Sequence, residues 1–589
     1  MNKILIYTIL LLTVFNTGGF AQTNVLTSLQ KTESYPVPEE AVFVHINSSL
    51  FFVGEYVYYK VYVNNLKTEN LSKVSKIAYL ELINENKESV LKQKIQLVSG
   101  IGQGDFFIPT AIPSGNYKVV SYTTNMLAKA SDNYFHQDVS IINPYRGNQN
   151  AISKNRSSTS EVDKTPKRVT ETSITENQEL LRINTDKKNY SKRSPVSLKI
   201  EKVGNEKLSG NYSVSVRKID TISHAPLQYT TNYKSIYNDS NSKIKPSQKQ
   251  FILPELRGEL LTGKIVSKTN NKNFDKQKVA LSIPGDNYIF KISNVDAEGN
   301  FYFNIDKPYV NNTVLLQVIG DNEAKFDIEV NKQLPISFKN LEFNQFFITP
   351  EMENMIVERS VYNQIENGYY RVKPDTIKTI PADTSIYKKR STVYNLDEYT
   401  RFPTIPETMV EIVNDAWITN RNGKNVFFVR NKENSLPTNQ PALLLVDGLF
   451  VQDHEILVNY NSNKVKSISI VQDKYYFGSQ TFQGIVFVET IDGDFYENIS
   501  RDYIKKIDIQ PAQRKKQYFN QTYADRNDET SQIPDYRRQL LWFPELKVEG
   551  ESKEFTFYTS DLPGVFEINL QGFTKEGKPV SIKEKFTVE

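Results

Sequence analysis

The pattern of apolar residues from Val42 onward constrains this chain more than any other feature of its sequence. Apolar positions alternate with polar ones or form short runs, rich in Val, Ile, Tyr and Phe, that Gly, Asn and Pro interrupt. Alternation is typical of strands with one buried face, and short apolar runs are typical of strands covered on both faces. At 589 residues the chain has room for about four domains of about 150 residues. The sequence therefore predicts a mainly β protein of tandem β-sandwiches.

Segments with a helical period are scarce. The best candidates are 350–365 and 406–415. The second follows Thr404, a possible N-cap, and has Glu407 three residues further on, which is the spacing of a capping box. We expect a helix at each place, between or beside the sandwiches.

Composition excludes several kinds of chemistry. The sequence has no cysteine, so disulfides, thiolate metal sites and a cysteine nucleophile are excluded. The four histidines, at 45, 136, 224 and 454, have no spacing typical of a helical metal pair. Lys and Arg number 72 against 68 Asp and Glu, and a net charge of +4 gives no global attraction to nucleic acid. We expect no catalytic residue, metal site, cofactor or nucleic-acid partner.

The first 21 residues predict an export signal. Lys3 precedes an apolar stretch from Ile4 to Phe15, and Gly19 and Ala21 are small residues at the −3 and −1 positions of a cleavage site. The stretch is too short for a membrane-spanning helix, which needs about 20 apolar residues. We expect residues 1–21 to be a signal peptide. The mature chain would lie in the periplasm or at the outer membrane, or alternatively at the cell surface or in the medium.

Two polar features lie outside the strand pattern. Segment 146–178 has almost no large apolar residue, which predicts a disordered linker. Short basic patches at 514–516 and at Arg537-Arg538 are expected to be solvated surface.

Segment 40–143 forms the first predicted module. A Gly54-Glu55 turn precedes an aromatic strand, and Pro113-Ser114-Gly115-Asn116 forms a later turn. The segment resembles the macroglobulin-like β-sandwich of the alpha-macroglobulin superfamily, through Val42, His45, Gly54, Glu55, Tyr59, Lys60, Tyr62 and Val63. The family's Asp-Arg pair is replaced here by Asn47-Ser48.

Two further segments resemble the same family. Segment 180–250 shows a similar succession of strands, which predicts a second macroglobulin-like sandwich. Segment 535–589 is predicted to be a C-terminal one, and it is similar to the family at Leu541, Trp542, Pro544, Phe557, Asp561, Pro563, Gly564, Phe566, Ile568 and Gly572. Without cysteine the chain cannot form the Cys–Gln thioester by which the family traps proteases.

Segment 251–335 resembles the carboxypeptidase-regulatory-like β-sandwich. The matching positions are Gly263, Val266, Asp296, Gly299, Phe301 and Phe303. Asp296 to Gly299 predicts a plain hairpin turn in which glycine supplies a positive φ. Asp296 and Glu298 alone offer too few oxygens for a calcium site.

Segment 396–495 predicts a small α+β domain. It resembles the plug domain of TonB-dependent outer-membrane receptors of the SusC-like branch, through Pro441, Val446, Asp447, Gly448, Val451, Ser467, Ile468, Val471, Asp473, Gly478, Gly484, Ile485, Val486, Val488 and Thr490. Asp447-Gly448 fits a hairpin turn, and Gly478 and Gly484 allow positive φ or close backbone approach. A catalytic acid/base pair of Asp447 and Asp453 is the alternative interpretation of this segment. After Thr490 only 99 residues follow (589 − 490), too few for a receptor barrel.

These resemblances imply a protein that works through its surfaces. We expect a non-enzymatic accessory subunit of an outer-membrane transport, secretion or assembly complex, which docks on or plugs an integral β-barrel partner and contacts other subunits. Tyr475, Tyr476 and Phe477 are the candidate partner contacts, in a variable loop of the plug-like domain. The alternatives are a freely secreted or surface-displayed binding or adhesion protein, and a hydrolase with a hidden carboxylate pair.

Overall fold

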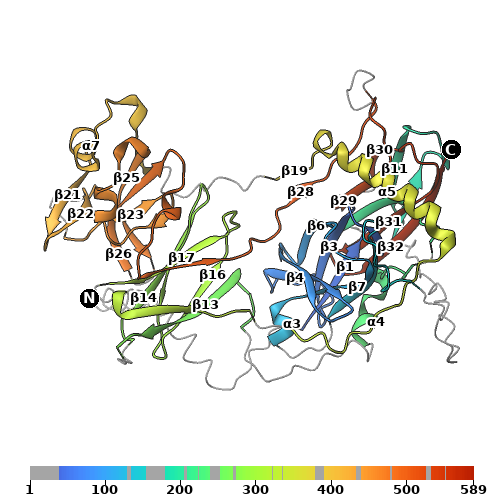
Figure 1. The fold of residues 1–589 in the computed structure, drawn as a ribbon, viewed down its shortest axis with the longest axis horizontal. Coiled ribbons are helices and arrows are strands. Elements are labelled where there is room, and N and C mark those ends of the chain that lie inside the picture. Colours follow the sequence, from blue (N-terminus) through green and yellow to red (C-terminus); the bar gives the residue numbers. More distant parts are fainter. Residues whose placement is uncertain are drawn as a thin grey trace, which may run out of the picture.

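The fold is mainly β, as the sequence predicts, and combines three β-sandwiches with one α+β domain (Figure 1). The computed structural model describes residues 39–128, 134–153, 180–204, 209–222, 224–238, 253–269, 274–320, 323–333, 336–378, 390–432, 439–477, 480–524, 532–548, 550 and 552–589. The predicted signal peptide and residues 154–178 of the predicted linker lie outside these ranges.

The first sandwich packs a three-stranded sheet, β1-β3-β6, on a five-stranded sheet, β2-β8-β7-β4-β5. Its elements are β1 (Glu40–Ile46), β2 (Leu50–Phe52), β3 (Tyr56–Asn65), β4 (Ile77–Asn84), β5 (Ser89–Gln96), β6 (Ile101–Phe107), β7 (Gly115–Tyr122), α3 (Thr124–Ala128) and β8 (Phe135–Ile142). Nearly every residue of β1 and β7 is buried, because other parts of the molecule cover the outer faces of these sheets. This double covering explains why the sequence shows apolar runs here rather than strict alternation.

The second sandwich is made from two segments that lie far apart in the sequence. Its elements are β9 (Leu181–Thr185), β10 (Asn189–Tyr190), β11 (Pro195–Lys202), β12 (Gly210–Lys218), β29 (Gln539–Val548), β30 (Ser552–Tyr558), β31 (Gly564–Thr574) and β32 (Pro579–Val588). Strand β12 pairs with both β29 and β31, and β11 pairs with β30.

The prediction of separate macroglobulin-like sandwiches over 180–250 and 535–589 is therefore wrong. The two segments are halves of one sandwich with a common core. The physical reason is that four strands of the first half cannot cover their own apolar faces, so the C-terminal strands complete the sheets. Sequence patterns place strands but not their partners, and sequence neighbours are only the commonest partners.

The third sandwich is completed by a strand from beyond the α+β domain. It packs sheet β16-β13-β18 on sheet β15-β14-β17-β27. Its strands are β13 (Glu259–Ser267), β14 (Lys278–Ile283), β15 (Ile289–Asn294), β16 (Asn300–Ile305), β17 (Thr313–Ile319), β18 (Phe326–Val330) and β27 (Ile504–Asp508). Asp296 accepts hydrogen bonds from Glu298 N and Asn300 N, and Gly299 has φ +91°, so the predicted hairpin turn is present.

The α+β domain has a five-stranded sheet of order β20-β25-β26-β23-β24, in which β23 runs parallel to β26. Its main elements are β20 (Thr392–Asn395), α7 (Ile405–Glu411), β21 (Ala416–Arg421), β22 (Lys424–Val429), β23 (Leu443–Val446), β24 (Leu449–Phe450), α8 (Glu455–Val458), β25 (Val465–Phe477) and β26 (Gln480–Thr490). Thr404 caps α7 as predicted and accepts a hydrogen bond from Glu407 N at 3.3 Å. The helix is shorter than the predicted 406–415.

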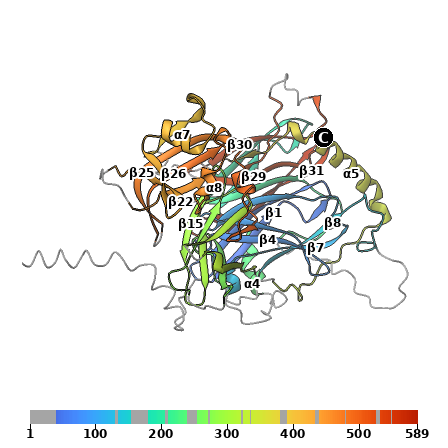
Figure 2. The ribbon, with the colours of Figure 1, turned by 60° about the vertical axis from the view of Figure 1, so that its left-hand side comes forward.

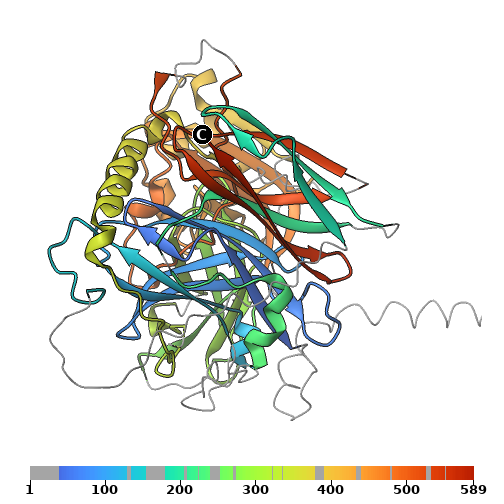
Figure 3. The same cartoon turned by 90° about the vertical axis from the view of Figure 1, so that its right-hand side faces the viewer.

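Helix α5 (Glu353–Gly368) follows a short 3-10 turn, η5 (Pro350–Met352), near the predicted segment 350–365. It lies along the first and second sandwiches (Figure 3). Beneath its first turns lies an apolar cluster that includes Phe52, Ile142 and Ile152. Ile152 is fully buried, so the segment 146–153 belongs to the packed structure and the predicted linker begins too early.

The chain returns from the third sandwich to the second as an extended segment. Gln513 N donates to Lys94 O at 2.7 Å, and Lys516 pairs with Asp105 at 2.8 Å. Here β28 (Lys516–Gln517) pairs with β19 (Thr376–Ile377), the segment that follows α5. Of the basic patch at 514–516, Lys516 is therefore partly buried against the first sandwich and is not solvated surface.

The α+β domain is mounted on the third sandwich at one end of the molecule (Figures 1 and 2). Phe290 of β15 contacts Phe450 and Phe477, with ring centroids 5.2 Å and 4.9 Å away. Phe450 N donates to Ser282 Oγ at 3.1 Å, and Gln317 Nε2 donates to Phe450 O at 2.7 Å. Apolar packing and buried hydrogen bonds together fix the orientation of this domain.

Gly448→Ala tests this contact. Gly448 has φ +83°, and an added Cβ would meet the Cβ of Tyr288 at 2.2 Å, so the α+β domain must shift. Gly423→Ala is the matched control, because its φ is +82° and nothing lies within 4 Å. We expect Gly423→Ala to cost about 1–2 kcal/mol from backbone strain alone, and Gly448→Ala to cost about 1–3 kcal/mol more from overpacking. Equal losses of thermal stability in the two variants would contradict the contact.

A buried carboxyl group joins the first and third sandwiches. Glu255 lies just before β13 and accepts hydrogen bonds from Tyr79 Oη at 3.1 Å and from Leu260 N at 3.2 Å. Burial raises the pKa of Glu255 to about 7, and the charge of Glu259 acts in the same direction. Compared with the unfolded chain, the folded protein therefore favours the protonated form of Glu255.

Glu255 makes stability depend on pH. Its contribution is fully present below pH 4.5, the ordinary pKa, and is lost as the pH rises to about 7. We expect Glu255→Gln to reduce the loss of unfolding free energy between pH 4.5 and pH 8 by about 3 kcal/mol. Denaturant unfolding at both pH values measures this difference. The exposed Glu411→Gln is the control, and an unchanged pH dependence in Glu255→Gln would show that Glu255 does not titrate in this window.

Candidate binding cleft

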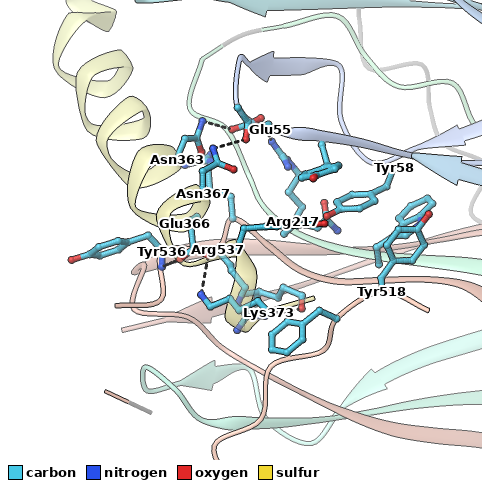
Figure 4. A pocket seen from close by; sticks show the side chains of 18 of the residues that line it. Glu55, Tyr58, Arg217, Asn363, Glu366, Asn367, Lys373, Tyr518, Tyr536 and Arg537 are labelled. Carbon is cyan, nitrogen blue, oxygen red and sulfur yellow. Dashed lines mark hydrogen bonds and ion pairs between the residues drawn. The ribbon is translucent and has the colours of Figure 1, made fainter. Parts of the chain in front are cut away.

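A cleft lies where the first sandwich, the second sandwich and helix α5 meet. It consists of an inner cavity of about 160 Å³ and an outer cavity of about 680 Å³. Gly54, Tyr56, Asn367 and Tyr370 line both, so the two cavities are neighbours. Figure 4 shows the inner cavity, with side chains from the β2–β3 turn, from α5 and from the segment before β29 pointing toward it. A concave site at a module junction is the usual place for a ligand.

A buried ion network forms one wall of the cleft. Glu55, in the turn between β2 and β3, accepts hydrogen bonds from Arg359 Nε at 2.7 Å and from Arg359 Nη2 at 2.8 Å. Arg217 of β12 approaches the same carboxylate at 3.2 Å. Asp220, beyond β12, pairs with Arg359 at 2.8 Å and with Arg538. One arginine of α5 thus joins acidic groups from both sandwiches.

The network holds its carboxylates in the charged state. Burial alone would raise the pKa of Glu55, but the charges of Arg359 and Arg217 outweigh it and hold that pKa well below its usual range. Burial, helped by the charge of Arg359, lowers the pKa of Arg538 to about 10. The five side chains are therefore strongly coupled, and each depends on the others for compensation of its buried charge.

A second network lies at the opposite side of the inner cavity. Arg537 binds Asp535 through two hydrogen bonds of 2.7 Å each. Lys373 pairs with Glu366 of α5 at 2.9 Å, and Tyr536 N donates to the same carboxylate at 2.6 Å. Burial raises the pKa of Glu366, against the opposing charge of Lys373. The middle of α5, at Arg359, and its C-terminal part, at Glu366, are thus tied to neighbouring segments by charged groups.

Aromatic rings line the cleft between these networks. Tyr370 stacks on Tyr56 at 5.7 Å, Tyr56 on Tyr58 at 5.9 Å, and Tyr58 on Trp542 at 6.0 Å, with interplanar angles of 15°, 16° and 22°. Tyr518 from the returning segment meets Tyr58 edge-on at 5.0 Å. The row of rings runs from the exposed Tyr370 to the buried Trp542 and provides a continuous apolar surface beside fixed charges.

The sequence-predicted partner contacts lie elsewhere, and for two of them the prediction is wrong. Tyr475 is buried and Phe477 is half-buried, because both pack with Phe290 and Phe482 between the α+β domain and the third sandwich. Only Tyr476 points away, and 69% of its surface is exposed. Alternation along β25 explains this pattern, because adjacent residues of a strand face opposite sides.

The predicted structural residues of the plug-like motif occupy turns. Asp447 and Gly448 join β23 to β24 with φ of +49° and +83°. The Asp447 carboxylate accepts Thr490 N at 2.8 Å and Thr490 Oγ1 at 2.6 Å, so it ties the turn to the end of β26. Gly484 has φ +77°, and a Cβ there would meet Val429 at 2.4 Å. Gly478 lies outside the described residues.

Sequence patterns missed most residues of the cleft. Arg537 and Arg538 were expected to be solvated but lie in buried ion pairs. Arg217, Arg359 and Lys373 had no local signal, because each acquires its partner from a distant segment. Among the described residues that line the cleft, Gly54, Glu55 and Trp542 belong to the macroglobulin-like resemblances.

The described residues contain no group of three or more His, Asp or Glu side chains that could hold a metal ion. None of the described helices is long and apolar enough to cross a membrane.

Comparison with known proteins finds similarity only among solved structures. No protein-family model matches the sequence, and no curated protein matches it. The chain is similar to Salmonella alpha-2-macroglobulin reacted with methylamine, with 10% identity, a TM-score of 0.22, and 93% of this chain and 39% of that chain covered. It is also similar to trypsin-activated alpha-2-macroglobulin from Escherichia coli, with 8% identity, a TM-score of 0.23, and 94% of this chain and 42% of that chain covered. The match to an Escherichia coli adhesin has 8% identity and a TM-score of 0.13, and it covers 49% of this chain and 63% of that chain.

The chain spans about two fifths of the length of these macroglobulins. Their activities are not transferred to it, and the resemblance to a receptor plug stays a prediction from the sequence.

Arg359→Met tests the ion network of the cleft. The substitution keeps an unbranched apolar side chain but removes the guanidinium, which leaves Glu55 and Asp220 buried without their main partner. We expect a loss of about 3–5 kcal/mol in unfolding free energy, measured by denaturant unfolding. Lys199→Met removes the exposed ion pair with Glu201 and is the control, with no measurable effect expected. A loss no larger than that of the control would contradict the role of Arg359.

Proposed function

We propose that this chain is an exported, non-enzymatic docking subunit of an outer-membrane complex. Its α+β domain would engage an integral β-barrel partner, and its β-sandwiches would contact other subunits. The observation that carries the proposal is the way in which the α+β domain is mounted. One side packs on Phe290 and Ser282 of the third sandwich, and the chain that leaves the domain continues into β27 of that sandwich. The domain is therefore presented in a fixed orientation.

Exposed apolar side chains support a contact through this domain. Val410 of α7 is 80% exposed, Tyr476 is 69% exposed and Val393 is 50% exposed. Helix α7 lies at the end of the molecule opposite the second sandwich (Figure 1). Tyrosine is enriched among the residues that anchor protein interfaces, so Tyr476 is the candidate anchor, and Val410 and Val393 add exposed apolar surface.

The carboxylates of the plug-like motif favour a structural role over catalysis. Asp447 accepts three hydrogen bonds, from Thr490 N, Thr490 Oγ1 and Phe495 N. Asp453 accepts one from Glu455 N at the start of α8. Both groups therefore act as caps of local backbone, which supports the non-enzymatic proposal over a hydrolase with this pair.

The export prediction and the plug-like sequence of 396–495 agree with a role at the outer membrane. The second candidate function is a secreted or surface-displayed binding protein. The cleft favours it, because an aromatic, ligand-sized cavity far from the α+β domain is not needed for docking on a barrel.

Photo-crosslinking in membranes tests the docking proposal. A photoreactive amino acid at Val410 is expected to form a crosslink to one integral outer-membrane β-barrel protein in the bacterium that encodes the chain. The matched control is the same substitution at Val565 of β31, which is 42% exposed on the second sandwich.

The tagged full chain should also co-purify with that barrel in stoichiometric amount after detergent extraction. Recovery of the chain alone from the soluble fraction or the medium would overturn the proposal and favour the second candidate. Crosslinks of equal yield from Val565 would show that the α+β domain is not the docking element.

A further inference from the structure

The outer cavity of the cleft combines aromatic rings with neutral polar groups. Its lining is Val53, Gly54, Tyr56, Phe107, Thr110, Tyr145, Gln364, Asn367 and Tyr370, and none of these side chains carries a charge. We propose that this cavity binds a neutral saccharide, with sugar rings against the tyrosine faces and hydroxyl groups at the amide side chains. This site is independent of docking through the α+β domain.

The exposed rings provide the first argument. Tyr145 is 47% exposed, and Phe107 and Tyr370 are each 39% exposed, although all three gather in one cavity. A pyranose ring has an apolar face of C–H groups that covers such a ring, and a rim of hydroxyl groups that stays at polar partners. The volume of about 680 Å³ lies in the range of about 300–1,000 Å³ that small-ligand sites occupy.

The polar groups provide the second argument. Gln364 Nε2 donates to Tyr145 Oη at 2.9 Å, and Asn367 Nδ2 donates to Gly54 O at 2.9 Å. Each amide is thereby oriented, and its oxygen remains available as an acceptor for a ligand hydroxyl, while Thr110 can donate or accept.

The same lining disfavours other ligands. A charged ligand would find no counter-charge in the outer cavity. A proline-rich peptide, which also binds aromatic grooves, offers no N–H at proline and would leave the two amide oxygens unmatched. A polyhydroxylated neutral ligand satisfies both the donors and the acceptors.

The walls of the cavity are held before any ligand arrives. Gly54 has φ +88°, a conformation that favours glycine, and a Cβ there would meet Asn367 Nδ2 at 2.9 Å and displace that amide. The next residue, Glu55, binds Arg359 and, at 3.3 Å, Asn363 on the same helix. The ion network thus fixes the distance between the tyrosine of β3 and the amides of α5, which lowers the entropic cost of binding.

Calorimetric titration of the full chain tests the proposal. The probes are neutral hexasaccharides derived from cellulose, xylan, mannan and starch, together with hexagalacturonate and a proline decapeptide. We expect saturable binding of at least one neutral hexasaccharide at a single site, little affected by salt. Tyr370→Ala and Gln364→Ala should each weaken this binding about tenfold or more, since each removes one stacking or polar contact.

The matched control is Tyr399→Ala, which removes a tyrosine of similar exposure, 43%, from the α+β domain and should leave binding unchanged. Thermal unfolding checks that each variant is folded. Three results would overturn the proposal: no binding of any hexasaccharide, preference for hexagalacturonate or the proline peptide, or equal binding by Tyr370→Ala and Tyr399→Ala. Loss of the membrane complex in the docking experiment would leave these results unaffected.

Discussion

The ion network around Arg359 is the constraint on which the arrangement of this molecule depends. Arg359 is 2% exposed and binds Glu55 of the first sandwich and Asp220 beyond the second. Burying these charges is costly, and only the complete set of partners compensates for the cost. A displaced sandwich or helix would leave a buried charge without its partner. The network therefore permits few relative positions of the first sandwich, the second sandwich and α5. These positions determine the shape of the cleft.

The order of the chain reinforces this constraint. The second sandwich begins at β9 and is finished only by β29 to β32, after the chain has built the third sandwich, α5 and the α+β domain. The third sandwich is likewise completed by β27 after the α+β domain. The third sandwich is therefore flanked in the chain by the two halves of the second, and the α+β domain is followed by β27 of the third. Nested connections of this kind restrict the motion of modules more than a single linker would, which suits a protein that presents a domain or a cleft in a fixed orientation.

The residues that carry the macroglobulin-like resemblance serve contacts between modules. Lys60 is fully buried and donates hydrogen bonds to Asn211 Oδ1, Tyr212 O and Pro544 O of the second sandwich. Burial lowers its pKa well below the usual value. His45 contacts Ser213 at 2.7 Å and lies 5.2 Å from the ring of Trp542. The buried polar residues His45 of β1 and Lys60 of β3 thus lie on the surface against which the second sandwich packs.

The sequence by itself determined which segments form strands, the turns at Asp296 and Asp447, the cap at Thr404, and the mainly β fold class. These features depend on residues within a few positions of one another. The tertiary structure alone decided that 181–218 and 539–588 share one sandwich, that Tyr475 and Phe477 are covered, and that Arg217, Arg537 and Arg538 line a cleft. The physical reason is that strand pairing and charge compensation join groups hundreds of residues apart, and a strand edge or an arginine carries no local mark of its distant partner.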